Sequence, residues 1–221
     1  MTIATDRDLD VQALVSAELE WTPDVDCTGI VVAVEHGAVV LSGEVDSYAE
    51  RLAARRAALR VRGVRAVVDN LTVHPRSPWP VTEAGIAQRV ERSLRETSDV
   101  PEAVTAEIHA RTVTLVGEVD WDFQRHAAQR AVQYLRGVGT VHNLISLTAR
   151  VPAPGTQEQI RTAITRNAQL DVTRIRVLVS GSRVTLTGTV KSWSQRAQAG
   201  HAAWASPHVV EVDNQIIVRT Y

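Results

Sequence analysis

The side chains that could act as metal ligands or catalytic groups in this sequence of 221 residues do not fall into the spacings of known sites. None of its seven histidines pair at the i, i+4 spacing of a helical metal site, and the HExxH, GxSxG, P-loop and GxGxxG patterns are absent. The single cysteine, Cys27, can form neither an intrachain disulfide nor a CxxC site. The sequence therefore predicts a non-enzymatic protein without catalytic residues, metal or cofactor.

Two carboxylates recur at one position of the sequence. Asp46 and Asp120 each follow a similar valine-rich segment, but Lys191 occupies the third such position. A catalytic set of three carboxylates is thereby excluded. A carboxylate just before a helix is favoured by the helix dipole, which explains the first two residues.

Aromatic side chains gather at the same places. Tyr48, Trp121 and Trp193 follow the three valine-rich segments, and Phe123 lies close behind Trp121. Tryptophan favours surfaces where one edge is wet and the other apolar, as at a membrane or a protein contact. We expect these four residues to bind lipid or a partner. The alternative is that they close the core or pack between repeats.

The valine-rich segments are an internal repeat. VVLSGEV at 39–45, VTLVGEV at 113–119 and VTLTGTV at 184–190 align on Gly43, Gly117 and Gly188, with spacings of 74 and 71 residues. Asn70, Asn143 and Asn214 form a second column downstream, with spacings of 73 and 71. Matched positions at a near-constant period indicate tandem copies of one structural unit.

Proline-rich stretches separate the copies. HPRSPWP at 74–80 and VPAPG at 151–155 hold five of the eight prolines, and such stretches break both helix and sheet. We therefore place the units at 1–75, 79–150 and 154–221.

Each unit has the same predicted order of elements. An apolar helical face opens it, as in Val11, Val15 and Leu19, and a strand hairpin follows that includes the glycine segment. An alanine-rich helix and a last strand complete it. The predicted fold class is α+β, with three tandem α-β-β-α-β units, each a small three-stranded mixed sheet packed with two helices. The repeated glycine is expected where the strand bulges or a helix backbone approaches closely.

Charge differs between the units although the formal net charge is only −1. Residues 1–76 carry 8 arginines against 12 acidic residues, or −4, whereas residues 154–221 carry 8 basic against 4 acidic residues, or +4. A basic unit could bind anionic lipid headgroups or the acidic end of another copy, head to tail. A scattered, solvated charge distribution is the alternative. No basic stripe with interleaved aromatics is present, so nucleic acid is not expected. The predicted basic site residues are Arg174, Arg176, Arg183, Lys191 and Arg196.

The pattern resembles the BON domain. The shared features are the α-β-β-α-β order, the central V-x-L-x-G-x-V, the alanine-rich helix, the pairs Gly63-Val64 and Gly137-Val138, and the V-x-N-x-hydrophobic ending. The third unit departs from the Gly-Val pair with Ser206-Pro207-His208-Val209. The resemblance implies phospholipid or membrane-surface binding in a stress or envelope-maintenance role, and it implies no catalytic residues.

Most characterised members of that family are exported, but MTIATDRDLD lacks a basic n-region followed by an apolar h-region. No apolar run approaches the roughly 20 residues that span a bilayer. The expected location is therefore cytoplasmic or peripheral at the membrane. The alternative function is a cytoplasmic scaffold that self-assembles or holds a protein partner.

Overall fold

A computed structural model describes residues 6–76, 81–148, 155–166, 175–206 and 208–219. The predicted order of elements is confirmed in all three repeats. Repeat 1 consists of α1 (Asp6–Glu20), the 3-10 turn η1 (Cys27–Gly29), β1 (Ile30–Glu35), β2 (Ala38–Val45), α2 (Tyr48–Arg60) and β3 (Ala66–Val73). Residues 77–80 and 149–154, between the repeats, lie outside the described residues, so the unit boundaries stay a prediction.

Repeats 2 and 3 follow the same order with interrupted strands. Repeat 2 consists of α3 (Glu83–Glu96), β4 (Thr105–His109), β5 (Thr112–Val116), β6 (Glu118–Val119), α4 (Asp122–Gln133), β7 (Thr140–Asn143) and β8 (Ser146–Leu147). Repeat 3 consists of α5 (Thr156–Arg166), β9 (Ile175–Ser180), β10 (Arg183–Val190), α6 (Trp193–Trp204), β11 (Glu211–Asn214) and β12 (Ile217–Val218).

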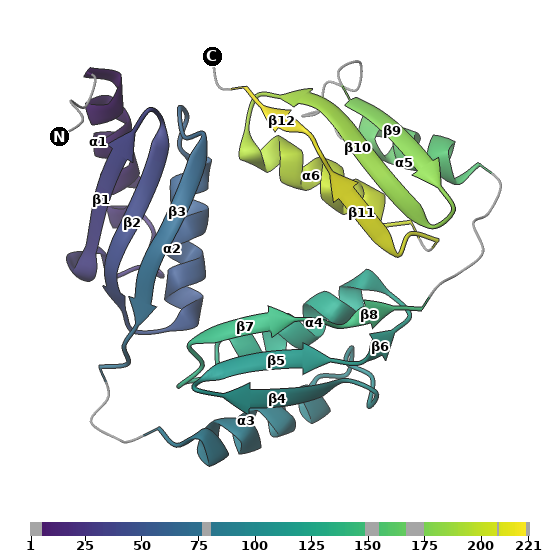
Figure 1. Cartoon of the computed structure of the whole chain (residues 1–221), viewed down its shortest axis with the longest axis horizontal. Helices are drawn as coiled ribbons and strands as arrows, with labels where there is room; N and C mark the ends of the chain where they lie inside the picture. The colour runs from purple at the N-terminus through teal and green to yellow at the C-terminus, as the bar shows by residue number, and fades with distance from the viewer. Residues whose placement is uncertain (1–5, 77–80, 149–154, 167–174, 207, 220–221) are drawn as a thin grey trace. The chain divides into compact units, whose positions relative to one another are not determined.

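The strand carrying the glycine motif is central in each sheet. In repeat 1 the order is β1-β2-β3, with β2 antiparallel to β1 and parallel to β3. The same mixed pairing recurs around β5 and around β10. The parallel pair arises because the second helix of each repeat is a crossover connection. Both helices of a repeat lie on one face of its sheet, so neither of them covers the other face (Figure 1).

The core of each repeat lies between that sheet and its two helices. In repeat 1 the helix residues Val15 and Leu19 pack with the strand residues Val39 and Leu41. Ala54, Ala57 and Ala58 are fully buried, as the alanine-rich face predicts. Small side chains let α2 lie close to the sheet. In repeat 3 the alternation of β9 is confirmed, because Ile175 and Val177 are buried.

The repeated glycine is confirmed as a position of close backbone approach, but the approaching segment is not a helix. Gly43 has φ +120°, and a Cβ there would lie 2.0 Å from the carbonyl oxygen of Gly29. At Gly117 the Cβ would lie 2.4 Å from the carbonyl oxygen of Ala103. Residues 29 and 103 precede the first strand of their sheets. At Gly43 and Gly117 a glycine is needed because the backbone just before the first strand lies too close to leave room for a Cβ.

The predicted equivalence of Asn70 with Asn143 and Asn214 is wrong, because the equivalent residue in repeat 1 lies one position earlier. Leu41 pairs with Asp69, just as Leu115 pairs with Asn143 and Leu186 with Asn214. The side-chain oxygen of each of these three residues accepts the backbone N–H two residues later. Asp69 is therefore the equivalent residue, and Asn70 is exposed. An aspartate accepts this local hydrogen bond as well as an asparagine does.

The second helix ends differently in repeat 3. Gly63 and Gly137 have φ +98° and +95° at the predicted helix stops, which is the conformation that glycine adopts most easily. In repeat 3 the cap residue Ala205 has φ −69° and stays right-handed. Val209 is nevertheless buried like Val64 and Val138, so the chain returns to the core without a glycine.

Candidate functional site

The predicted aromatic residues lie where the central strand of each sheet runs into the second helix, an area we call the rim of the repeat. A capping box forms the turn. In repeat 1 Ser47 Oγ accepts the N–H of Glu50 at 3.1 Å, and in repeat 3 Ser192 Oγ accepts that of Gln195 at 3.2 Å. The Gln195 side chain accepts the N–H of Lys191 at 2.8 Å in return. Each cap saturates N–H groups that the first helical turn leaves without a partner.

The rim of repeat 1 is closed by polar contacts. The buried carboxylate of Glu50 accepts the N–H groups of Asp26 and Asp46, both at 2.7 Å. The Arg76 guanidinium forms an ion pair with Asp26, and the Arg76 N–H donates to Asp46 at 2.6 Å. Hydrogen bonds from Thr28, together with that of Arg76, lower the pKa of Asp26 to about 2. These contacts join three chain segments and leave an acidic, well-connected surface.

Tyr48 does not contribute an exposed ring to this rim. Its relative exposure is 9%, and it lies at the first turn of α2 against the repeat. Tyr48 instead closes the core of repeat 1, which is the alternative that the sequence left open for these aromatic residues. We therefore leave it out of any lipid-binding or partner-binding surface.

The rim of repeat 2 exposes aromatic rings among carboxylates. Trp121 is 37% exposed and Phe123 is 53% exposed, at the start of α4. Glu118, Asp120 and Asp122 surround them in sequence.

The rim of repeat 3 combines a ring with positive charge. Val190 is the last residue of β10 and pairs with Val218, the last residue of the parallel strand β12. The next residues, Lys191 and Arg219, are both exposed and therefore follow two adjacent strand ends. The Arg219 N–H donates to the Val190 carbonyl at 2.8 Å. Trp193 is half-buried at the first position of α6.

Ile217, one residue before Val218, adds an apolar side chain to this surface and is 58% exposed. Ile217 pairs with Thr189 at the end of the sheet. We define the repeat-3 rim as Lys191, Trp193, Ile217 and Arg219, together with Arg176 of the adjacent strand β9.

The other predicted basic residues fall into different environments. Arg176 is exposed on β9 and pairs with Thr187, near the same end of the sheet as the other residues of the repeat-3 rim. Arg183 lies at the opposite end of β10, where it forms an ion pair with Glu211 at 2.7 Å.

Arg196 lies behind the rim and has a structural role. It donates to the carbonyl of Ile216 at 3.0 Å and to that of Asn214 at 2.5 Å. Its guanidinium carbon lies 5.6 Å from the Trp193 ring centroid. Arg174 lies outside the described residues. Within repeat 3, the predicted residues Arg176 and Lys191 therefore lie near one end of the sheet and Arg183 lies at the other.

Two residues of the repeat-3 rim were missed from the sequence. Ile217 and Arg219 lie near the end of the chain, 26 and 28 residues after Lys191. The signal that could have found them is the parallel pairing of the second and last strands, because it places the residues after both strands side by side.

The described residues also limit other kinds of site. No group of three or more His, Cys, Asp or Glu side chains among them is placed to hold a metal ion. None of the helices in the described part of the chain is long and apolar enough to cross a bilayer.

Comparison with known families assigns the fold. The BON domain matches three times, at residues 7–75, 82–149 and 154–220. The chain belongs to the BON domain family. BON domains are non-catalytic binding domains associated with phospholipid and membrane binding.

Other comparisons add little to this assignment. No curated protein matches the sequence. Among solved structures, the chain is similar to CdsD, a structural protein of the type III secretion system of Chlamydia trachomatis. The identity is 10% and the TM-score is 0.27, over 95% of this chain and 92% of that one. A structure of the CdsD C-terminal domain gives the same identity and TM-score, over 99% of this chain and 100% of that one.

Proposed function

We propose that this BON protein binds anionic phospholipid surfaces through the repeat-3 rim, peripherally from the cytoplasm, in a stress-associated or envelope-maintenance role. The observation that carries the proposal is that Lys191, Arg219 and the exposed Ile217 lie at one end of the sheet, where the chain turns into α6 at Trp193. Cations are attracted to the negative surface potential of anionic lipid, while an indole ring and an aliphatic side chain enter the interface. Family membership supports the same ligand class.

The corresponding regions of repeats 1 and 2 differ from the repeat-3 rim. The corresponding rim of repeat 1 buries its aromatic residue and carries three carboxylates, and that of repeat 2 surrounds its rings with acidic residues. Repeat 3 is also the repeat with a net charge of +4. The expected contribution is about 1 kcal/mol for each basic residue near the surface.

Vesicle co-sedimentation of the full chain tests the proposal. Removing two charges with Arg176→Ala and Lys191→Ala should cost about 2 kcal/mol, or a roughly 30-fold fall in the partition coefficient on anionic vesicles. The matched control is Arg55→Ala with Arg56→Ala, which removes two exposed charges from α2 of repeat 1.

The co-sedimentation experiment is repeated with neutral vesicles and at high salt concentration. Binding should disappear on neutral vesicles and in high salt, because screening shortens the range of the attraction. A partition coefficient that falls equally for both double variants would reject the repeat-3 rim as the contact. A chain that stays in the supernatant under all conditions would reject the lipid function itself.

Self-assembly is the second candidate, and a separate observation favours it. The face of the repeat 1 sheet that its helices do not cover carries Val31 and Val68, which are 66% and 45% exposed, and Val40 pairs with Val68 across that face. An acidic repeat with an apolar face could meet the basic repeat of another copy, head to tail. Sedimentation velocity over a range of protein and salt concentrations distinguishes this candidate, because it predicts salt-sensitive oligomers without lipid.

A further inference from the structure

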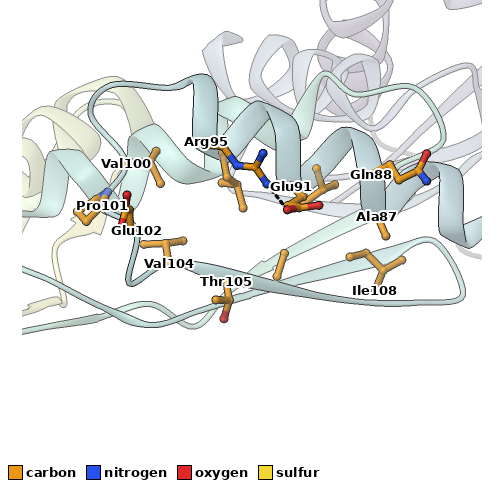
Figure 2. Close-up of a pocket in the computed structure, with 13 residues that line it drawn as sticks. Ala87, Gln88, Glu91, Arg95, Val100, Pro101, Glu102, Val104, Thr105 and Ile108 are labelled. Carbon is orange, nitrogen blue, oxygen red and sulfur yellow. Dashed lines mark hydrogen bonds and ion pairs between the residues drawn. The ribbon is translucent and has the colours of Figure 1, made fainter.

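A groove in repeat 2 lies between α3 and the edge strand β4. Its volume is about 590 Å³, within the range of about 300–1,000 Å³ typical of small-molecule pockets. Buried Val90, Leu94 and Val104 form part of its lining. Figure 2 shows Ala87 of the helix above Ile108 of the strand, with Val100 and Val104 farther along. The groove lies within one repeat, so its shape does not depend on the placement of the others.

Repeats 1 and 3 carry a cross-link at the corresponding position. In repeat 1 the Gln12 side chain donates from α1 to the carbonyl of Val32 on β1 at 2.9 Å. In repeat 3 Gln157 donates from α5 to the carbonyl of Val177 on β9 at 3.0 Å. Each glutamine joins the first helix to the edge strand and covers the space between them.

In repeat 2, alanines occupy the two positions that form this link in repeats 1 and 3. Ala87 precedes the buried Val90 by three residues, as Gln12 precedes Val15 and Gln157 precedes Ile160. That correspondence places Ala87 at the glutamine position.

The strand end of the link is fixed by register. Ala106 pairs with Leu115 just as Val32 pairs with Leu41 and Val177 pairs with Leu186. Ala106 is half-buried, whereas Val32 and Val177 are buried. The groove of repeat 2 therefore exists because an alanine replaces a glutamine and another alanine replaces a valine.

The chemistry of the groove selects its ligand. Its apolar lining is aliphatic, without an aromatic ring, and its charged side chains stand at the exposed edge, where Arg95 forms an ion pair with Glu91 (Figure 2). The buried side chains offer no hydrogen-bond partner. A hydrocarbon chain has no polar group to satisfy, so it can fill a space lined by aliphatic side chains without a hydrogen-bond partner.

We propose that the groove of repeat 2 binds one unbranched aliphatic chain of an amphiphile, with the polar head in water beside Glu91 and Arg95. The chain could come from a free fatty acid or from a membrane phospholipid. The proposal does not rest on the repeat-3 rim, because it concerns a different repeat and a ligand that is held without a charged surface.

Titration calorimetry of the full-length protein with laurate, below the concentration at which it forms micelles, tests the proposal. The wild-type chain should bind one laurate per molecule with a negative heat-capacity change, as burial of apolar surface requires. Ala87→Gln with Ala106→Val rebuilds the link of repeats 1 and 3 and should weaken binding at least tenfold. Those side chains occur at the same positions of the same fold, so the variant should fold, which circular dichroism would check.

The reciprocal variant gives an independent readout. Gln12→Ala with Val32→Ala opens the corresponding space in repeat 1 and should raise the stoichiometry from one laurate to two. A wild-type chain that does not bind laurate, or an affinity unchanged by Ala87→Gln with Ala106→Val, would overturn the proposal. Binding of an extended valine-rich peptide but not of laurate would also overturn it, in favour of a peptide groove.

Vesicle co-sedimentation distinguishes the two sources of the chain. If a free fatty acid is the ligand, Ala87→Gln with Ala106→Val leaves the partition on anionic vesicles unchanged while laurate binding falls. If a phospholipid supplies the chain, both fall together. Loss of vesicle binding in the Arg176→Ala, Lys191→Ala variant with normal laurate binding would assign the two ligands to separate sites.

Discussion

Replacing Gly43 by alanine tests why the glycine motif recurs. Gly43 has φ +120°, a region that other residues rarely adopt, and a Cβ there would lie 2.0 Å from the Gly29 carbonyl oxygen and 3.2 Å from its carbonyl carbon. Backbone strain in such a region costs about 1–3 kcal/mol, and forcing an extra carbon against backbone atoms costs about 1–3 kcal/mol more. Gly43→Ala should therefore destabilise repeat 1 by about 2–6 kcal/mol.

Hydrogen exchange followed by mass spectrometry is the suitable assay, because a chain of three repeats need not unfold in a single two-state transition. Peptides from β1 and β2 should lose most of their protection in Gly43→Ala. Peptides from repeat 3 should not change.

The control is Gly181→Ala in the hairpin turn of repeat 3. Gly181 has φ +60°, but no atom lies within 4 Å of its hypothetical Cβ. Its replacement should cost only the left-handed backbone conformation, about 1–2 kcal/mol. Equal losses of protection in the two variants would show that close approach of the Gly29 backbone is not the reason for the glycine.

Two further predictions concern the rim of repeat 1. The pKa of Asp26 is lowered from 3.8 to about 2, so this carboxylate stabilises the fold fully above about pH 4 and loses its effect as the pH falls toward 2. The urea midpoint should fall over that window in the wild type and less steeply in Asp26→Asn; equal slopes would contradict the assignment. Glu50→Gln leaves one oxygen for the two N–H groups that Glu50 accepts and should cost about 1–3 kcal/mol in urea unfolding. In Gln195→Glu the one N–H accepted by residue 195 keeps its partner, so a loss as large as that of Glu50→Gln would refute the reasoning.

The repeat and its fold could be predicted because they depend on local patterns. The glycine columns set the period, and the alternation in RIRVLVS together with the alanine-rich faces gave the elements and their buried sides. Because those buried sides must pack onto one another, the helices and strands of so small a unit can be arranged in few ways.

The surface could be predicted only in part because it depends on register and on neighbours. Tyr48 and Trp193 both begin the second helix of their repeat, yet Tyr48 is buried and Trp193 is half-buried beside Arg196. The shift from Asn70 to Asp69 became visible only through strand pairing. Counting arginines predicted a basic unit but could not show that Arg183 is neutralised by Glu211, because these residues meet across two strands.

The three repeats share the same kind of buried core and differ at positions on the boundary of that core. The capping position holds Glu50 in repeat 1, where it accepts two backbone N–H groups, and Gln195 in repeat 3, where it accepts one. The position that links the first helix to the edge strand holds Gln12 and Gln157 but Ala87 in repeat 2. Interior residues of one repeat must fit each other, so they change little, whereas these boundary positions can change one at a time. Such changes would let one fold supply a closed acidic rim, an aliphatic groove and a basic aromatic rim within a single chain.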